Sequence, residues 1–521
     1  MTPARPGRRR FLKIAGVTVV VGGSGWGANW LSVYSDHQIS NVGKLKFRNR
    51  LRVPELLDPK PSGDGRKQYT LKLAEGTSEL LPGKKTKTWG ANGPYLAPTI
   101  RARRGDKVSM TVHNGLPDAT TLHWHGMHLP PAMDGGPHQM IERDGTWKPQ
   151  WTVHQPACTL WYHPHPHGST AGHVYRGIAG MIILDDEHST GAPLPSRYGV
   201  DDLPLVIQDK NFHDDGSLDF GESSFFDTIA GMDPLGILGD TIIVNGTYDP
   251  YFHVTTTRVR LRLLNGSNAR VYQLGFPDER TFHLVAAENG LLPRPRPLTR
   301  LQLGPGERAE IVVECKPGEQ AVLRSFAPDL GIGFPTDRFH GGDDTFDILA
   351  LRAAKTLRPS PALPTRFAGA PAPIKVPNDA KVRKFHFVGT QINGKSMDIN
   401  RVDEVVAAGA TEIWEIDRGD GTLHSFHVHG ATFNVLDVDG EQPPEEARGP
   451  KDTVYLPESG KVRLAVRFDT LTDDRVPYMY HCHVLRHEDD GMMGQFLVVA
   501  PDAVDRAPRT IEGSHGGSGH H

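Results

Sequence analysis

Short stretches of alternating apolar and polar residues recur along the whole chain, separated by turns rich in glycine and proline. Residues 107–112 (Lys-Val-Ser-Met-Thr-Val) show this period of two, as do residues 258–264 and 412–416. Successive side chains of a β-strand point to opposite faces of a sheet, so the pattern predicts half-buried strands. Long helical periodicities are scarce. The chain is therefore predicted to be all-β.

Two breaks divide this pattern into domains. Residues 358–377 are rich in proline and alanine, as is typical of a linker, and glycine and proline cluster again near residues 190–198. A chain of 521 residues has room for about three domains. We expect a leader at 1–35, domains at roughly 40–190, 198–355 and 378–503, and a tail at 504–521.

An internal repeat relates the first and third of these domains. A shift of 304 positions aligns Leu-His-Trp-His-Gly at 122–126 with Phe-His-Val-His-Gly at 426–430. Further along, His-Pro-His at 163–165 corresponds to His-Cys-His at 481–483. Two related domains with matching histidines predict a site that both of them build.

The middle domain carries a related strand but not the histidines. Residues 261–266 resemble residues 110–115 and end in the same Asn-Gly pair. Counting on from that pair, Leu274 and Phe276 occupy the His-x-His positions, so this domain is predicted to be a metal-free spacer.

Histidine is unusually frequent, with 26 copies, about double the ordinary usage. A single His-x-His triplet is weak evidence, but four triplets at matching places in two repeats are not expected by chance. Residues i and i+2 of a strand project from the same face, so paired strands would gather these imidazoles on one surface of each domain. Facing surfaces would enclose a cavity with enough ligands for three copper ions and open positions for oxygen. The eight predicted ligands are His123, His125, His163, His165, His427, His429, His481 and His483.

A second set of ligands surrounds the cysteine. Cys482 lies between two of those histidines, so on a strand its side chain faces away from the cavity and into the third domain. His424 lies three residues before His427, so on a strand its side chain also faces away from the cavity. Together with His487 and Met492, these residues supply two imidazoles, a thiolate and a weak thioether, which are the ligands of a blue electron-transfer copper site. Met493 is the alternative thioether, but one of two adjacent strand residues is expected to point outward, and the spacing favours Met492.

The sequence links the two sites covalently. Cys482 would bond one copper while its neighbours His481 and His483 bond two others, which gives electrons a short route between the sites. The first domain has Thr120 and Pro164 at the positions corresponding to its own blue site. Only the third domain is therefore predicted to hold the blue copper.

The whole ligand pattern resembles that of the multicopper oxidases. The motifs are H-W-H-G, H-P-H, H-S-F-H-V-H and H-C-H-x3-H-x4-M, and they span essentially the whole chain after the leader. They are most similar to those of bacterial laccase-like enzymes and periplasmic copper-efflux oxidases. The resemblance implies three cupredoxin-like Greek-key β-sandwich domains and four copper ions. It assigns His424, Cys482, His487 and Met492 to the type 1 copper, His123 and His427 to the type 2 copper, and His125, His163, His165, His429, His481 and His483 to the type 3 pair.

The same resemblance implies the activity. In this family a reducing donor gives up electrons singly at the type 1 copper, here through the edge of His487, and the three-copper cluster reduces O2 to water. Because that reduction consumes protons, acids near the cluster are useful relays. Glu488 and Asp134 match acidic positions of the efflux oxidases; the alternative is a turn residue and a solvated loop charge.

The donor is left open by the motifs. Copper-efflux oxidases often carry a methionine-rich insert, but between residues 341 and 400 the only methionine is Met397. Laccase-like oxidation of phenolic or aromatic donors is therefore favoured over oxidation of Cu(I) or another metal ion. A loop with Met127, Met133, Met140, His128 and His138 is either a soft-metal site or, more simply, ordinary packing. A non-enzymatic periplasmic scaffold is a distant alternative, because such relatives lose their ligands.

The N-terminus predicts export. Arg-Arg-Arg-Phe-Leu-Lys at 8–13 fits a twin-arginine signal, and the apolar run at 14–21 is too short to span a bilayer comfortably. We expect a periplasmic or extracellular protein that uses the twin-arginine translocation machinery, without stable membrane insertion after export. The 58 basic and 61 acidic residues provide no basic face for nucleic acid.

The remaining cysteines leave two alternatives. Cys158 and Cys315 form one disulfide or, as is favoured, remain two buried thiols. The histidines of residues 514–521 bind metal weakly at most and are expected to lie in a disordered tail.

Overall fold

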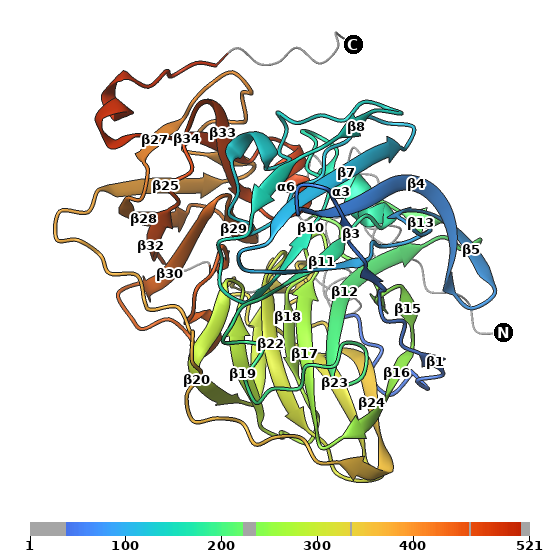
Figure 1. The fold of residues 1–521 in the computed structure, drawn as a ribbon. Helices are drawn as coiled ribbons and strands as arrows, with labels where there is room; N and C mark the ends of the chain where they lie inside the picture. Colours follow the sequence, from blue (N-terminus) through green and yellow to red (C-terminus); the bar gives the residue numbers. More distant parts are fainter. Residues whose placement is uncertain (1–37, 222–235, 334–335, 458–459, 512–521) are drawn as a thin grey trace, which may run out of the picture.

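Three β-sandwiches contain almost all of the regular structure (Figure 1). The computed structural model describes residues 38–221, 236–333, 336–457 and 460–511. The predicted leader and the histidines of the terminal run lie outside these residues. In Figure 1 the blue-to-cyan, green-to-yellow and orange-to-red sandwiches meet at the centre of the molecule. The all-β prediction is confirmed.

The first sandwich reproduces the expected alternation of buried and exposed positions. Its strands are β2 Leu56–Leu57, β3 Lys60–Pro61, β4 Lys67–Leu81, β5 Lys84–Ala91, β6 Thr99–Arg103, β7 Lys107–Gly115, β8 Thr146–Trp147, β9 Gln150–Thr152, β10 Cys158–Tyr162 and β11 Gly180–Asp185. In β4, Tyr69, Leu71 and Leu73 are buried and the residues between them are exposed. One sheet has the order β3-β4-β7-β8, with β5 and β9 also paired to it, and the other has the order β10-β11-β6-β2.

The second sandwich is the largest. Its strands are β1 Asn49–Arg50, β12 Asp202–Phe212, β13 Leu218–Asp219, β14 Thr241–Val244, β15 Thr247–Tyr248, β16 Pro250–Thr256, β17 Arg258–Asn265, β18 Tyr272–Gly275, β19 Phe282–Ala287, β20 Gly290–Leu298, β21 Arg300–Leu303, β22 Arg308–Glu314, β23 Gln320–Phe326 and β24 Phe346–Arg358. The sheets run β15-β14-β12-β17-β22-β19-β20, with β13 beside β12, and β1-β16-β24-β23-β18-β21. Strands β17 and β22 are buried along almost their whole length because the other domains cover them. Leu274 and Phe276 lie in the core of this sandwich.

The third sandwich carries the cysteine. Its strands are β25 Val382–Val388, β26 Gln391–Ile392, β27 Glu404–Ala407, β28 Thr411–Arg418, β29 His424–Val428, β30 Ala431–Val438, β31 Thr453–Leu456, β32 Val462–Phe468, β33 Asp473–Cys482 and β34 Met493–Val499. The sheets run β26-β25-β28-β32-β30 and β27-β34-β33-β29-β31. Trp414, Phe426 and Tyr480 pack between them.

Both ends of the described chain depart from the expected boundaries. Residues 40–53 were expected to begin the first domain, but β1 pairs in parallel with β16 and Ser40 bridges to Thr345, both in the second sandwich. Ile511, expected in the tail, is buried against the third sandwich beside Val402. An edge strand accepts backbone pairing from any segment that reaches it, so the sequence pattern does not identify such partners.

The described helices are short and lie outside the sheets. They are α3 Thr170–Arg176, α5 Thr336–Phe339 and α6 Leu485–Asp489, with 3-10 turns η1 Pro131–Met133, η3 Glu445–Ala447 and η4 Pro501–Arg506. Helix α3 of the first domain packs on α6 of the third through Ala171, Val174 and Leu485. Within the described ranges, no helix has the length and apolar character needed to cross a membrane.

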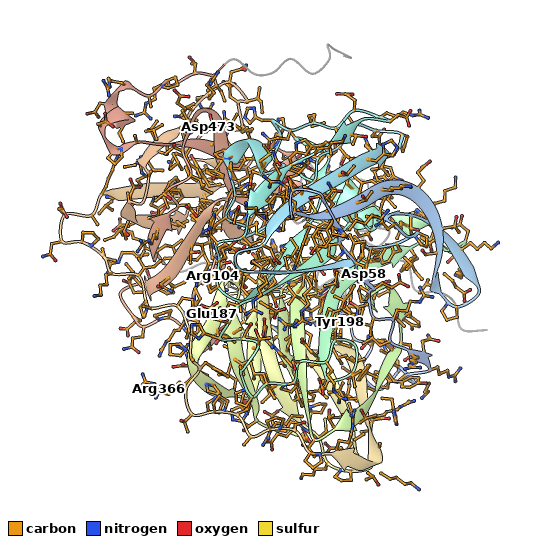
Figure 2. The ribbon with its side chains drawn as sticks, viewed as in Figure 1. Asp58, Arg104, Glu187, Tyr198, Arg366 and Asp473 are labelled. Atoms are coloured by element: carbon orange, nitrogen blue, oxygen red, sulfur yellow. The ribbon has the colours of Figure 1, made fainter. Side chains whose placement is uncertain are left out.

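Side chains fill the sandwiches and the region between them (Figure 2). Arg366, labelled in that figure, lies on the linker, and the adjacent Phe367 is buried against Leu194 and Val285. The linker thus packs on the middle sandwich. Cys158 and Cys315 are both buried and free, which confirms the favoured alternative.

Candidate metal centre

The eight predicted histidines meet between the first and third sandwiches. His123 forms a backbone bridge with His163, and His427 of β29 pairs with His481 of β33. These pairings bring the triplets of each domain together, as the strand geometry requires. The histidines of the first domain also contact those of the third, because His125 stacks on His427 with ring centroids 3.6 Å apart. All eight side chains are buried.

The ring nitrogens fall into three groups. In each group the potential ligand atoms lie within 4.8 Å of one another. The groups are His125, His163 and His483; His165, His429 and His481; and His123, His427 and His429. All three draw on both domains, so neither domain could build any of them alone.

Backbone carbonyls fix which nitrogen faces the cavity. The Nδ1 atoms of His123 and His427 lie 3.0 and 2.9 Å from the carbonyl oxygens of Asp134 and Asp452. The Nδ1 atom of His163 lies 2.8 Å from the carbonyl of Pro164. Because each Nδ1 must donate its proton to a carbonyl, each Nε2 keeps a free lone pair for a metal.

Several of these lone pairs have no protein partner. Among the described residues, Nε2 of His123, Nε2 of His427 and both ring nitrogens of His483 are buried without a hydrogen bond. Buried polar atoms are rarely left in this state. Burial also lowers the pKa of His163, His429 and His483 well below the ordinary value, so these rings are neutral. A nest of neutral imidazoles with inward lone pairs fits a metal cluster.

His125 is oriented in the opposite sense. Its Nε2 lies 3.1 Å from a carboxylate oxygen of Asp452, while its Nδ1 lies 3.4 Å from Nε2 of His163. Its available lone pair is therefore on Nδ1.

Both predicted acids are buried against histidines. Asp134 Oδ2 lies 2.6 Å from Nδ1 of His429. The two oxygens of Glu488 lie 3.4 and 3.2 Å from Nδ1 of His165 and His481. Burial raises the pKa of Glu488, but the neighbouring histidines lower it more, so the net pKa lies below the ordinary value. Neither residue is a solvated surface charge.

The second cluster forms inside the third sandwich. Cys482 Sγ lies 3.5 Å from Nδ1 of His424 and 3.5 Å from Nδ1 of His487. Asp420 and Thr422 hold the other ring nitrogen of His424 at 3.2 and 3.0 Å. Burial raises the pKa of the Cys482 thiol to about 12, so a bound metal is needed to keep it as the thiolate.

Two expectations about this cluster need correction. Met493 was expected to point outward, yet Met492 and Met493 are 0% and 1% exposed. Met493 instead pairs with His481 on the strand ladder, whereas Met492 packs in the same apolar cluster as Cys482. His487, whose edge was expected to face the donor, is fully buried.

The loop methionines and histidines do not form a site. His128 is bound to Asp469 and Thr432, and His138 lies 2.8 Å from Gln495. Met127 is in the core of the first sandwich, while Met140 is 40% exposed. This outcome agrees with ordinary packing.

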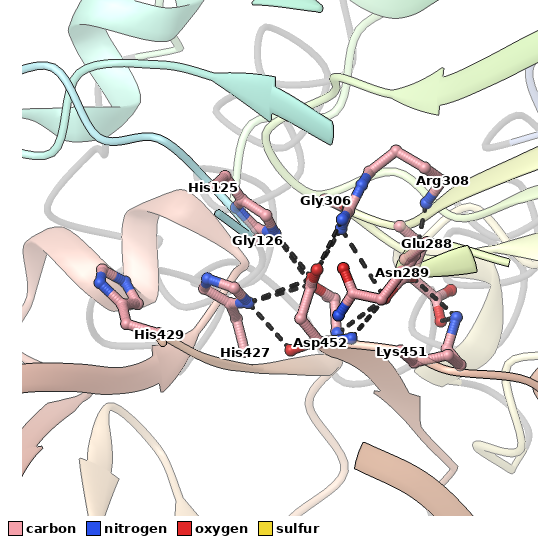
Figure 3. Close-up of polar contacts among 12 residues, drawn as sticks. His125, Gly126, Glu288, Asn289, Gly306, Arg308, His427, His429, Lys451 and Asp452 are labelled. Atoms are coloured by element: carbon pink, nitrogen blue, oxygen red, sulfur yellow. Dashed lines mark hydrogen bonds and ion pairs between the residues drawn. The ribbon is translucent and has the colours of Figure 1, made fainter. Parts of the chain in front are cut away.

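Sequence reasoning missed the charged residues behind the cluster. Asp452 contacts His125 and His427, and Arg308 of the middle domain binds Asp452 through both of its carboxylate oxygens (Figure 3). Glu288 and Lys451 complete this buried network. The only sign of this network in the sequence was the charged pair Lys451-Asp452 just before β31. A charged pair does not by itself indicate that its side chains are buried.

Three β-sandwiches with these two clusters define the class: a copper protein built from cupredoxin-like domains. Two domain models, both described as multicopper oxidase, match residues 72–189 and 371–502. The multicopper oxidase of Staphylococcus aureus is 36% identical over 462 residues, which cover 88% of this chain and 94% of that protein. The chain belongs to the multicopper oxidase family.

Other relatives have different names. The cell division protein FtsP of Sodalis glossinidius is 36% identical over 507 residues, covering 95% of this chain and 99% of that protein. The structure of a laccase from Pediococcus acidilactici is 34% identical, with a TM-score of 0.77 over 87% of this chain and 94% of that one. A Campylobacter jejuni multicopper oxidase, called a metallo-oxidase, is 26% identical, with a TM-score of 0.74 over 88% and 97%.

Proposed function

We propose that the protein is a laccase-like oxidase that couples one-electron oxidation of phenolic or aromatic donors to the four-electron reduction of O2 to water. The observation that carries the proposal is the tripeptide at 481–483. Its cysteine lies in one buried ligand cluster and its two histidines lie in the other. Such a connection serves electron transfer between two metal sites and has no purpose in a single one.

The ligand clusters would divide among about four copper ions. His424, Cys482, His487 and Met492 would hold the type 1 copper, His123 and His427 the type 2 copper, and His125, His163, His165, His429, His481 and His483 the type 3 pair. When bound, the copper would supply the redox chemistry, taking electrons singly from the donor and delivering them to O2. The protein holds the imidazoles neutral and oriented and keeps both clusters away from bulk water.

Asp134 and Glu488 are proposed as proton relays. Each is buried beside the histidine cluster, where it would take up a proton and release it to the site of O2 reduction. Asp134→Asn keeps the shape and removes the acid, and we expect a lower rate of O2 consumption and an altered pH–rate profile. An unchanged profile would remove Asp134 from this role.

Metal-ion oxidation is the second candidate, supported by the relative described as a metallo-oxidase. The low methionine content between residues 341 and 400 favours organic donors. Turnover of a phenolic donor, measured with and without added copper, separates the two. A rate that vanishes without added copper would reject the laccase-like proposal.

A scaffold without enzymatic activity is the remaining alternative, and the likeness to a cell division protein is its support. The complete set of ligand side chains favours an oxidase. Reconstituted protein that stays colourless and binds far fewer than about four copper ions would reject the enzyme in favour of the scaffold.

We further propose that the twin-arginine machinery exports the folded protein to the periplasm or beyond the cell. O2 and a small donor are then the expected partners, without nucleic acid or stable membrane insertion. The double variant Arg8→Lys, Arg9→Lys should leave the protein in the cytoplasm in a cell-fractionation assay. Unimpaired export of this variant would argue against the signal.

A further inference from the structure

A turn of the middle domain reaches the histidine cluster. Gly306 has a φ of +81°, and a Cβ atom there would lie 2.8 Å from ring carbons of His483. His483 therefore lies directly against the backbone of this turn, where L side chains would not fit. Strand β22 begins two residues later, at Arg308, whose side chain points to the same cluster (Figure 3).

Arg308 forms an ion pair with Asp452 of the third domain. Its Nη1 and Nη2 atoms each donate to one carboxylate oxygen of Asp452, both at 2.6 Å, and both side chains are fully buried. A Cβ atom at Gly126 of the first domain would lie 2.8 Å from Nη2 of Arg308. All three domains thus meet at this forked ion pair.

Asp452 in turn orients two cavity histidines. Its carboxylate lies 3.1 Å from Nε2 of His125, and its backbone carbonyl lies 2.9 Å from Nδ1 of His427. Among the cavity histidines that have a hydrogen-bonded outer nitrogen, His125 differs because Nδ1 is its inward atom. A carboxylate held by Arg308 can only accept from Nε2, and this leaves Nδ1 with the lone pair.

The remaining partners hold Asp452 in place. Glu288 accepts hydrogen bonds from the backbone N–H groups of Asp452 and Thr453 at 2.8 and 2.9 Å. Lys451 lies 2.7 Å from Glu288 and balances its charge. Thr453 Oγ1 donates to one oxygen of the Asp452 carboxylate at 2.7 Å and lies 3.0 Å from Nε2 of His125. Arg308 is the partner that holds both carboxylate oxygens, so it fixes the plane of the carboxylate.

We propose that Arg308 is a positioning residue for the copper cluster, acting through Asp452 to fix the orientation of His125. The middle domain is then part of the metal centre's framework and not a spacer. This inference rests on the proposed copper content of the eight-histidine cavity. It concerns a residue that would touch neither copper nor substrate.

The test compares Arg308→Lys with Arg260→Lys. Lysine keeps the charge but loses the fork. Arg260 is the matched control because it also makes a buried ion pair, with Glu310 in the same domain, and has no contact with a cavity histidine. Copper per chain is measured after dialysis against graded chelator, and the visible thiolate-to-copper band is measured on the same samples.

We expect Arg308→Lys to weaken copper binding in the cavity about 10- to 100-fold, the usual cost of losing a residue that orients a ligand. The visible band per chain should stay at the wild-type level because the Cys482 cluster lies elsewhere. Arg260→Lys should match the wild type in both measurements. Equal copper retention by the two variants would overturn the proposal, as would parallel loss of the cavity copper and the visible band.

A second variant covers the case in which Arg308→Lys does not fold. Asp452→Asn keeps the shape of the side chain but removes the negative charge that pairs with Arg308. The same selective loss of cavity copper is expected. Retention of wild-type copper by this variant would overturn the proposal. Wild-type protein that binds no copper would instead reject the proposed function, so the two failures are distinguishable.

Discussion

At the scale of single residues, the two ring nitrogens of the clustered histidines have different roles. In most of these histidines one nitrogen is held by a carbonyl or carboxylate and the other faces the cavity or Cys482, whereas neither nitrogen of His483 has a hydrogen bond. Such partners fix the tautomer and the ring orientation before any metal arrives. The side chains themselves were predictable from the sequence, but their partners were not, because Asp452 is distant from His125 along the chain.

The two adjacent methionines give a prediction at this scale. Met492→Leu removes the thioether that is proposed as the weak ligand of the type 1 copper, so we expect a higher type 1 reduction potential and a shifted visible spectrum. Met493→Leu is the control, since that side chain is equally buried but pairs with His481. Redox titration and absorption spectroscopy measure both effects. A shift with Met493→Leu alone would assign the axial position to Met493.

At the scale of elements, strand parity accounts for the separation of the sites. On β33, His481 and Cys482 point to opposite faces, and the antiparallel pairing of β29 with β33 places Phe426 opposite Cys482 and His427 opposite His481. The face of the sheet to which a side chain points depends only on its position along the strand, so the sequence predicts it. Pairing between distant strands depends on which edges are free, and β1 was therefore assigned to the wrong sandwich.

The packed C-terminal segment gives a prediction at the element scale. A chain that ends at Arg506 loses the burial of Ile511 against Val402 and the hydrogen bond from Ile511 N–H to Asn400. Losing one buried isoleucine side chain costs roughly 2 kcal/mol, so the free energy of unfolding should fall by about that amount. A chain that ends at Glu512 keeps both contacts and is the control. Equal urea midpoints for the two chains would show that the segment contributes nothing.

At the scale of the whole molecule, three domains converge on one buried polar centre. The first and third domains supply the histidines, and the middle domain supplies Arg308 and Gly306. Burying so many titratable groups makes the folded state sensitive to protons whenever no metal is bound.

The pH dependence of the copper-free protein follows from this burial. Burial lowers the pKa of His427 to about 4 and that of His165 to about 3, against an ordinary value of 6.5. The unfolded chain therefore binds more protons than the folded protein below about pH 6.5, and stability falls as the pH falls toward those lowered values. We expect losses of about 1.4 kcal/mol per pH unit for each such histidine, measured by urea unfolding across this range. His165→Gln should reduce the slope, and a free energy of unfolding that does not change with pH would contradict the prediction.

The sequence by itself determined the all-β class, the repeat and the identity of the histidines and the cysteine that gather in the two clusters. Those features depend on local periodicity and on residue chemistry, which the chain carries at each position. Tertiary structure alone decided that Asp452 and Arg308 stand behind His125, that His487 is buried, and that the N-terminal segment pairs with the middle sandwich. Those outcomes depend on which surfaces meet when the three domains pack. The periodicity of one segment does not indicate which other segment it will contact.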